Sequence, residues 1–415
     1  MKKSFITLIV LAAFLASLAL GCGGSEKAST TSAVTAPPTS QSGTATTAAD
    51  ASAATTAEPT TVTQVKAEEV ALFPASRGGK TGYIDSKGKW IIQPQFFSAY
   101  RFSEGLAAAT IDESDWKYGY VDGAGSWVIE PQFVNCLDFS EGLAAVQMQE
   151  HGFWGYIDHT GKLVIPPKFQ FSESVPGTEG VFSDGLAQFS ADGGRLWGYF
   201  DKNGNEVIKP QFDTTSVFSD GLAAVQLGEE SYFINQTGQR VFESQDYVAA
   251  GPFSEGLAPV AVKDAGGTKY GFIDRTGKIV IQPQFDWVGR FSEGLAMFGA
   301  GDKSAADATF GFIDTRGQIV IQPQYDYGYS SEPKAAMPDD LNFSDGLALV
   351  TSDHGETWAY IDKRGAVVIQ PQTLLMATPF RNGLARLTFG DLFAPADWRS
   401  VYIDKSGKTV WDNGS

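Results

Sequence analysis

The sequence predicts an all-β protein built from tandem repeats of three to four strands. One phrase, an aromatic residue followed by Ile-Asp-x-x-Gly or a close variant, occurs nine times after residue 69. A second phrase, Phe-Ser-Glu/Asp-Gly-Leu-Ala, alternates with it, and no segment after the first 20 residues carries a helical apolar stripe. Repeats of about 40 residues with three or four strands match propeller blades. We therefore expect a β-propeller of eight to nine blades, and the alternative is an open β-repeat array.

Residues 67–415 carry the nine units, and each unit contains a predicted turn. The turn begins with Asp, or with Asn in one copy, and a Gly follows three residues later. These glycines are Gly88, Gly125, Gly161, Gly204, Gly238, Gly277, Gly317, Gly365 and Gly407. An Asp side chain can accept hydrogen bonds from N–H groups two residues on, and Gly supplies the positive φ of a type I turn followed by a bulge. The phrase therefore predicts two short strands joined by a tight turn.

A proline follows the turn Asp by nine residues in seven of the units. Because proline cannot donate to a strand ladder, we expect it to end the second strand. The Gly-Leu-Ala phrase predicts another tight turn that leads into a further strand. The stretch 70–72, Val-Ala-Leu, stands where the ninth copy of that strand should be. The segment after the proline would add a fourth strand if it pairs at a sheet edge.

Residues 1–21 are typical of an export signal. Two lysines precede an uncharged apolar run, residues 5–20, which fits a signal h-region and is short for a membrane span. Cys22 follows Gly21 at the end of this run, and the pattern resembles the bacterial lipoprotein signal, although Ala19 stands where Leu is commonest. The resemblance implies that Cys22 carries a lipid that anchors the protein to the bacterial cell membrane or outer membrane. An ordinary secretory signal is the alternative.

Residues 22–66 predict a disordered tether between the lipidated Cys and the repeats. Of the 40 residues from Ser25 to Gln64, 28 are Ala, Ser or Thr. Such a segment has few large apolar groups to offset its ordering entropy, and as a coil it would span roughly 30–40 Å.

Two copies of the repeat carry a full Trp-Gly phrase. The stretches Trp154–Asp158 and Trp197–Tyr199 read Trp-Gly-Tyr-Ile-Asp and Trp-Gly-Tyr, which resembles the WG-repeat family of bacterial proteins. The resemblance covers about Val70 to Trp411, and the fifth unit diverges most, with Asn235 for Asp and no Pro. It implies a repeat module without assigned enzymatic chemistry, often in exported proteins. It supplies no catalytic residue.

Residue types that carry chemistry are sparse. His151, His159 and His354 form no metal-spaced pair and are expected in solvated loops. Cys136 is the only cysteine besides Cys22, and we interpret it as a small half-buried side chain because no base is near it in the sequence. We predict no enzymatic activity, no catalytic residue, no metal and no cofactor.

The acidic balance excludes one class of partner. A formal net charge of -17 argues against nucleic-acid binding, which needs a basic patch. Eight turn Asp and seven Glu or Asp before Gly-Leu-Ala make 15 of the 48 acidic residues. We therefore interpret the charge largely as turn chemistry that is repeated in every unit.

The units differ mainly in the loop between Leu-Ala-x-Val and the next aromatic-Gly phrase. It is short at residues 228–230 and long at 299–309 and 389–399. In an up-and-down blade these loops share the face opposite the Asp-x-x-Gly turns, and variable loops on a rigid scaffold commonly bind partners. The insertion Gly328–Leu341, with Glu332, Asp339 and Asp340, is a further candidate.

These observations favour a lipid-anchored binding or scaffold protein of the cell envelope that engages a protein partner through its variable loops. The alternative is a propeller that binds carbohydrate, either peptidoglycan or polysaccharide, which needs several exposed aromatic rings. Trp90, Trp127, Trp154 and Trp197 are the candidates, although most such rings should pack in the core or at blade edges. An envelope hydrolase with two convergent carboxylates is less favoured. The sequence does not identify the partner-binding residues.

Overall fold

The computed structural model describes residues 71–414 except for the gaps 114–115, 172–179, 191–193, 243–246, 301–307, 327–340, 371–373 and 391–397. The predicted signal 1–21, the tether 22–66, the lipid-attachment residue Cys22 and nearly all of the insertion Gly328–Leu341 lie outside the described residues. Ala71 onward forms one compact unit.

The described strands group into nine successive blades. Blade 1 contains β1 (Phe73–Arg77), β2 (Lys80–Ile84) and β3 (Trp90–Phe96). Blade 2 contains β4 (Ser98–Ser103), β5 (Leu106–Thr110), β6 (Tyr118–Val121) and β7 (Trp127–Phe133). Blade 3 contains β8 (Asn135–Cys136), β9 (Ala144–Gln147), β10 (Trp154–Ile157) and β11 (Leu163–Phe169). Blade 4 contains β12 (Leu186–Ser190), β13 (Trp197–Asp201) and β14 (Glu206–Phe212). Blade 5 contains β15 (Thr214–Thr215), β16 (Leu222–Leu227) and β17 (Glu230–Asn235). Blade 6 contains β18 (Tyr247–Ala250), β19 (Leu257–Asp264), β20 (Gly267–Asp274) and β21 (Ile279–Phe285). Blade 7 contains β22 (Trp287–Ser292), β23 (Leu295–Ala300), β24 (Thr309–Asp314) and β25 (Ile319–Tyr325). Blade 8 contains β26 (Leu347–Val350), β27 (Ala359–Asp362) and β28 (Val367–Ile369). Blade 9 contains β29 (Met376–Ala377), β30 (Leu384–Phe389), β31 (Arg399–Asp404) and β32 (Thr409–Asp412).

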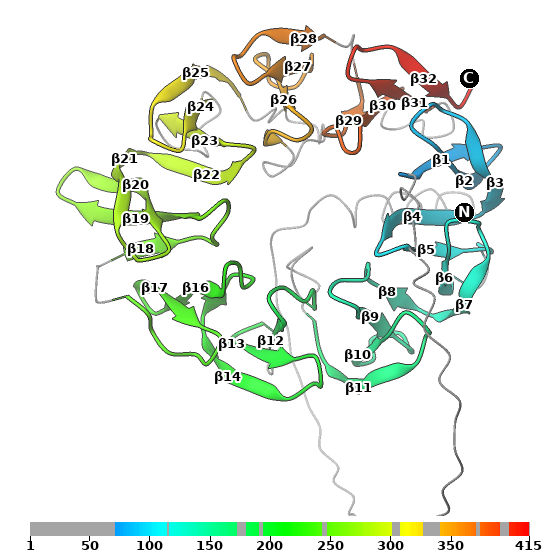
Figure 1. Cartoon of the computed structure of the whole chain (residues 1–415), viewed down its shortest axis with the longest axis horizontal. Coiled ribbons are helices and arrows are strands. Elements are labelled where there is room, and N and C mark those ends of the chain that lie inside the picture. The colour runs from blue at the N-terminus through cyan, green and yellow to red at the C-terminus, as the bar shows by residue number, and fades with distance from the viewer. Residues whose placement is uncertain are drawn as a thin grey trace, which may run out of the picture. The chain divides into compact units, whose positions relative to one another are not determined.

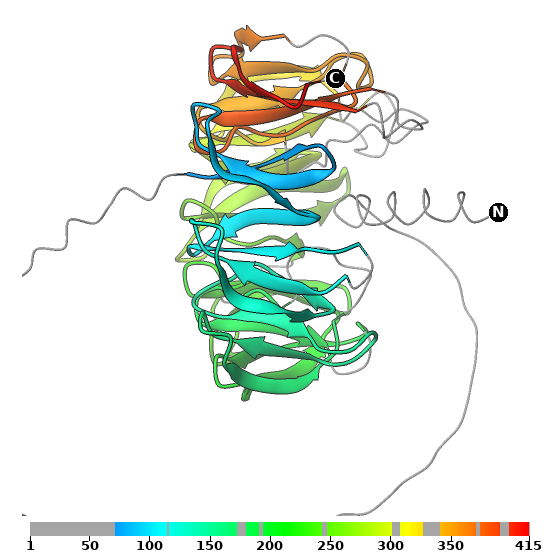
Figure 2. The ribbon, with the colours of Figure 1, turned by 90° about the vertical axis from the view of Figure 1, so that its right-hand side faces the viewer.

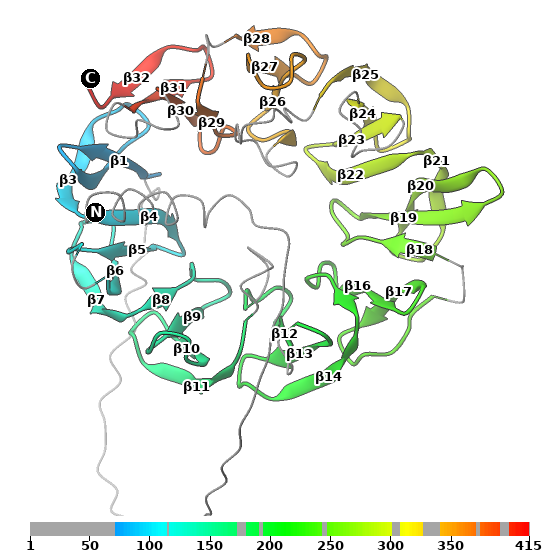
Figure 3. The same cartoon turned by 180° about the vertical axis from the view of Figure 1, so that it is seen from behind.

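Each complete blade is a small antiparallel sheet whose strands follow one another in sequence order, such as β4-β5-β6-β7. We name its strands inner, second, third and outer, because the first lies toward the centre of the ring and the last at the rim (Figure 1). The blades follow in sequence order around the ring, as the view from behind also shows (Figure 3). The predicted all-β propeller is confirmed, with nine blades. The segment after the proline does supply the inner strand, here β4, of the next blade.

Two places depart from this scheme. Blade 5 has no outer strand among the described residues, and its β17 pairs with β18 of blade 6 through Ser231 and Tyr247. Blades 5 and 6 therefore share a seven-stranded sheet. Blade 1 begins at its second strand, β1, so its described residues include no inner strand.

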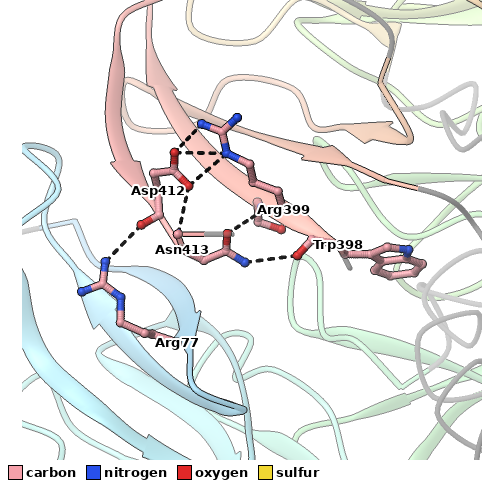
Figure 4. Close-up of polar contacts among 7 residues, drawn as sticks. Arg77, Trp398, Arg399, Asp412 and Asn413 are labelled. Atoms are coloured by element: carbon pink, nitrogen blue, oxygen red, sulfur yellow. Dashed lines mark hydrogen bonds and ion pairs between the residues drawn. The ribbon is translucent and has the colours of Figure 1, made fainter. Parts of the chain in front are cut away.

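The first and last blades pack against each other and close the ring. The Tyr402 hydroxyl donates to the Pro74 carbonyl at 2.8 Å, and the rings of Trp90 and Trp411 meet edge to face at 5.8 Å between centroids. Figure 4 shows a polar clasp on the same seam, where Arg77 donates to the Asp412 carbonyl at 3.1 Å. In the same clasp the Arg399 guanidinium is ion-paired with the Asp412 carboxylate, and Asn413 donates to the Trp398 carbonyl at 3.3 Å.

The same aromatic contact recurs at every blade boundary. A Tyr or Phe of one third strand meets a Phe of the next blade, as in Tyr120 with Phe139 at 4.9 Å and Tyr199 with Phe218 at 4.7 Å between ring centroids. At the closing boundary Tyr402 meets Phe73 at 5.7 Å. These third-strand rings are buried. Because they join neighbours, the core is shared between blades, which explains why one unit alone buries too little to fold.

The Asp-x-x-Gly turns have the predicted geometry. Asp85 Oδ1 accepts hydrogen bonds of 2.9 Å from the N–H groups of Lys87 and Lys89, and Gly88 has a φ of 80°. Hydrogen bonds from Thr276, first from its hydroxyl, lower the pKa of Asp274 in the equivalent turn of blade 6. Each turn Gly also lies close to the preceding blade. A Cβ on Gly125, for example, would lie 2.7 Å from Ile92 Cγ2.

The prediction that proline ends the second strand of each turn was wrong. Pro94 lies inside β3, which continues to Phe96, and the register shifts between the Thr81–Phe96 and Tyr83–Ile92 pairs. The extra outer-strand residues form a bulge that brings the backbone onto Gly82, where a Cβ would lie 2.4 Å from the Ile92 carbonyl oxygen. The strand can include proline because it is an edge strand, and the bulge requires the Gly of the aromatic-Gly phrase.

Candidate functional site: two faces of the ring

Strand direction divides the connections between two faces. Because neighbouring strands are antiparallel, the turns from inner to second strand and from third to outer strand lie on one face, which we call the turn face. The loops from second to third strand and the crossings to the next blade lie on the opposite face, the loop face. The blades are seen edge-on in Figure 2, with the turn face to the left. This arrangement agrees with the prediction that the variable loops share one face.

The turn from inner to second strand uses two left-handed residues. In blade 2 Glu104 has a φ of 51° and Gly105 a φ of 83°. This is the type I′ geometry, which matches the twist of a hairpin and tolerates Glu or Asp less readily than Gly. The sequence predicted a tight turn here, but not the left-handed conformation of the acidic residue.

The acidic residue of this turn bonds to the next blade. Glu104 Oε2 accepts a 2.9 Å hydrogen bond from the Gly142 N–H of blade 3, and Glu141 Oε2 accepts one of 2.9 Å from the Gly185 N–H of blade 4. Equivalent bonds join Asp184 to Gly221, Glu255 to Gly294, Glu293 to Gly346 and Asp345 to Gly383. A backbone N–H that donates to a carboxylate makes a strong hydrogen bond. These carboxylates are therefore part of the scaffold.

Several of the same carboxylates also meet a cation of the next blade. Lys202 Nζ lies 3.0 Å from Glu141 Oε2, and Lys363 Nζ lies 3.2 Å from Glu293 Oε2. Arg275 is likewise paired with Asp220, and His159 Nε2 lies 3.1 Å from Glu104 Oε2. The turn face thus carries a series of inter-blade bonds, which supports the interpretation of the acidic excess as structural chemistry.

The loop face differs from blade to blade. In blade 8 the loop that begins at Thr351 is held by the Asp353 carboxylate, which accepts from the Thr357 N–H at 2.9 Å and from both threonine hydroxyls. The His354 N–H donates to Asp326 Oδ2 at 3.0 Å. In blade 5 a short hairpin around Gly228 replaces this loop. The same scaffold position therefore presents different surfaces.

Exposed apolar side chains gather on the loop face of blades 2 to 5. Phe153 is 51% exposed and Leu227 is 50% exposed, each at the loop between second and third strands. Ile111, Met148 and Leu196 are exposed in equivalent loops. We call these five residues the apolar arc. The other exposed large apolar residues of the described chain lie on outer strands, except Tyr100.

Two hollows lie beside the arc, where blades 5 and 6 join. One has a volume of about 320 Å³ and is lined by Leu227, Glu229, Glu230, Tyr247 and Val248. Glu229 and Glu230 are both exposed, and Glu230 is paired with Arg240 at 2.7 Å. The hollow thus places two glutamates at the edge of the apolar arc.

The second hollow has a volume of about 130 Å³ and a neutral lining. Hydroxyl and amide groups line it, from Thr214, Thr215, Ser216, Gln226 and Ser231. No group of three or more potential metal ligands occurs in the described part of the chain.

The repeat aromatics are mostly packed. Trp197 is buried, while Trp90, Trp127 and Trp154 are half-buried against other rings, such as Phe96 against Trp127 at 5.6 Å. Only two aromatic side chains, Tyr100 and Phe153, are among the exposed large hydrophobics of the described residues. The set of equivalent exposed rings that carbohydrate stacking needs is therefore not present in the described blades.

The histidines and Cys136 differ in their surroundings. His151 and His354 lie in loop-face connections, and both have positive φ. His159 lies in the Asp158 turn, where its partly exposed ring stacks on Phe139 at 4.4 Å between centroids. Cys136 is half-buried, and burial raises the pKa of its thiol to about 12. Such a thiol is a poor nucleophile at neutral pH.

The described residues include no helix long and apolar enough to cross a membrane.

Solved structures resemble this fold at low sequence identity. A crystal structure of a eukaryotic initiation factor is 11% identical, with a TM-score of 0.53, and the match covers 83% of this chain and 96% of that chain. BamB from Moraxella catarrhalis is 13% identical, with a TM-score of 0.35, covering 76% of this chain and 92% of that chain. AztD from Citrobacter koseri is 12% identical, with a TM-score of 0.36, covering 83% and 94%. At 11% identity, the likeness to the initiation factor concerns the fold alone. No curated protein matches the chain.

The family model for the WG containing repeat matches eight segments. They are residues 82–113, 118–150, 154–193, 197–230, 233–264, 270–303, 310–332 and 358–393. Each begins at or near a third strand, and all but the segment 310–332 run from the aromatic-Gly phrase of one blade into the second strand of the next. The matches span more than half of the chain, and the protein belongs to the WG containing repeat family.

Proposed function

We propose that this protein is a non-enzymatic binding scaffold of the bacterial cell envelope, which holds a protein partner on the loop face. The apolar arc carries the proposal. Contiguous exposed apolar residues with a polar rim mark protein interaction sites, whereas isolated ones need no explanation. Five exposed apolar residues lie on the same face of four consecutive blades, which favours such a site there.

The flanking charges suit a protein partner better than a glycan. Glu229 and Glu230 border Leu227 at one end of the arc, so a partner segment with apolar side chains and basic neighbours would complement it. A carbohydrate ligand would need stacking platforms, and the described rings are mostly packed against one another.

The envelope location rests on the N-terminal sequence. An apolar run that ends in Cys22 supports export and lipidation, and the tether would let the ring reach partners away from the membrane. The Cys22→Ser exchange should release the protein from isolated membranes into the soluble fraction. Unchanged sedimentation with membranes would refute the anchor.

The partner site is tested by in-cell photocrosslinking from the arc. A photoreactive residue at position 153 should give a discrete crosslinked product, while one at position 280, which is exposed on an outer strand, should not. The Leu227→Ser exchange should weaken the product from position 153, and Val207→Ser, at a similarly exposed outer-strand site, should leave it unchanged. If the two positions give equal crosslinking, the arc is not a partner site.

A further inference from the structure

The turn face loses its carboxylates at one sector, the boundary between blades 9 and 1. In blade 9 the turn from inner to second strand reads Asn382-Gly383, with Asn where seven other blades have Glu or Asp. Blade 1 has Val70-Ala71 at the equivalent sequence position. Both acidic turn residues that would stand on this sector are therefore replaced by neutral residues.

The cations of this sector remain. Lys87 and Lys89 flank the turn Gly of blade 1, and Lys405 and Lys408 lie on the corresponding turn of blade 9. All four are exposed, and none forms an ion pair within the described residues. Elsewhere on this face Lys202 and Lys363 are ion-paired with carboxylates of the preceding blade.

The two turns are neighbours in space. A Cβ on Gly88, between the blade 1 lysines, would lie 1.8 Å from the Val410 carbonyl oxygen, two residues after Lys408. Arg381, also exposed, precedes Asn382 on the same face. We call Lys87, Lys89, Arg381, Lys405 and Lys408 the seam patch.

The acidic residues of this sector accept backbone hydrogen bonds, and one of them, Asp345 of blade 8, accepts from the Gly383 N–H beside Arg381. Asp85 Oδ1 accepts from the Lys87 and Lys89 N–H groups at 2.9 Å, and Asp404 Oδ1 accepts from the Ser406 and Lys408 N–H groups. Glu68 and Glu69 precede blade 1 in the sequence and lie outside the described residues. Five cations against three bonded carboxylates make this sector locally basic on a chain of net charge -17.

The chain also enters the ring at this sector. β1 is a second strand, and second strands start at the turn face, so Phe73 begins beside the seam patch. The segment that leads back to Cys22 therefore joins the ring on this face. A flexible tether raises the effective concentration of whatever lies at its other end.

We propose that the seam patch docks on an anionic phospholipid surface, that of the membrane in which the Cys22 lipid is inserted. This inference rests on the proposed lipid anchor. In this docked orientation the turn face lies against the bilayer. The apolar arc, on the opposite face, then points into the aqueous space where a partner can reach it. The lipid supplies attachment, and the lysines set the orientation by weak, salt-sensitive contacts with headgroups.

The test uses the full chain with Cys22→Ser, so that binding reports the patch and not the lipid. Flotation is measured with vesicles of phosphatidylcholine alone and with 30% phosphatidylglycerol. The seam variant changes Lys87, Lys89, Lys405 and Lys408 to Gln. The matched control changes Lys162, Lys278, Arg316 and Arg364 to Gln, which removes the same charge from turns of other blades on the same face.

Binding to the anionic vesicles, not to neutral ones, and its loss at high salt are expected. Each lysine near an anionic surface strengthens partition roughly fivefold, so the seam variant, which lacks four lysines, should lose roughly 600-fold, and the control should lose far less. Equal losses in both variants, or no binding to anionic vesicles at low salt, would overturn the proposal. The anchor is judged separately, because the seam variant with Cys22 intact should still sediment with membranes.

Discussion

The Gly of the aromatic-Gly phrase provides a direct test of the blade geometry. Gly311 lies on β24, where a Cβ would lie 2.1 Å from the Ile321 carbonyl oxygen and 2.7 Å from Pro323 N. Comfortable contacts between heavy atoms lie near 3.5 Å, so the outer strand must retreat by roughly 1 Å. All three nearest atoms belong to the backbone of that strand, so no side chain can rotate out of the way.

The Gly311→Ala exchange should therefore destabilise the protein. Forcing a methyl group into a packed site typically costs about 1–3 kcal/mol, and a rigid backbone neighbour places this site near the upper end. For a domain of this size such a loss lowers Tm by roughly 5 °C. Thermal unfolding followed by circular dichroism measures the shift. Hydrogen exchange of the amides in β25 should show whether the damage starts at the outer strand.

Gly289, on β22 of the same blade, is the matched control. The nearest atom to its added Cβ is Met297 Cβ at 3.5 Å, an ordinary contact, and its φ lies outside the left-handed region. The Gly289→Ala exchange should be neutral or stabilise the protein by about 0.5 kcal/mol, because it restricts the unfolded chain. If both variants melt within a degree of the wild type, the close approach of the outer strand is not a real constraint.

Three further predictions concern polar contacts. A hydroxyl of Thr276, Thr160 or Ser406 is the first cause that lowers the pKa of Asp274, Asp158 or Asp404, respectively. A carboxyl whose pKa is lower in the folded state than in the unfolded state stabilises the protein above about pH 4. This stabilisation is lost as the pH falls through the folded-state pKa. Melting temperatures should therefore fall in acid, and the Asp274→Asn variant should show a shallower fall than the wild type, whereas parallel curves would contradict the assignment. The Glu104–His159 contact joins blades 2 and 3 on the turn face, so His159→Ala should lower the free energy of unfolding in urea by about 1 kcal/mol, and an unchanged midpoint would mean that the contact contributes nothing. The buried Tyr360 hydroxyl donates to the Thr378 carbonyl at 2.7 Å, so Tyr360→Phe should cost about 1–2 kcal/mol in urea unfolding, and an unchanged midpoint would mean that the bond contributes nothing.

Much of the fold could be predicted because each blade repeats its local chemistry. Asp and Gly at fixed spacing determine a tight turn without any knowledge of neighbours, and Gly88 has the positive φ that this turn needs. Blade number followed from counting the phrase. Closure of the ring did not, because it depends on contacts such as Tyr402 with Pro74, which join residues more than three hundred positions apart.

The errors have a common physical origin. The proline was expected to end a strand because its missing N–H was considered alone, whereas the edge position and the bulge permit Pro94 within β3. Similarly, the turn acids were interpreted within their own turns, although Glu141 bonds to Gly185 of the next blade. The stacking of His159 on Phe139 was not predicted because the two residues belong to different phrases. The apolar arc was missed because exposure is a tertiary property, and only the loop face as a whole could be predicted.

The bulged outer strands also affect whether copies of the molecule can pair with one another. A propeller ends each blade in an unpaired strand, and here several of these strands expose Val or Ile, such as Val128 and Val320. A flat edge of this kind could template the addition of another chain, which is the first step of aggregation. In most blades a proline that offers no N–H and a bulge that breaks the regular spacing make the edge a poor template. The proline that was expected to end a strand thus protects the rim of the ring from self-association.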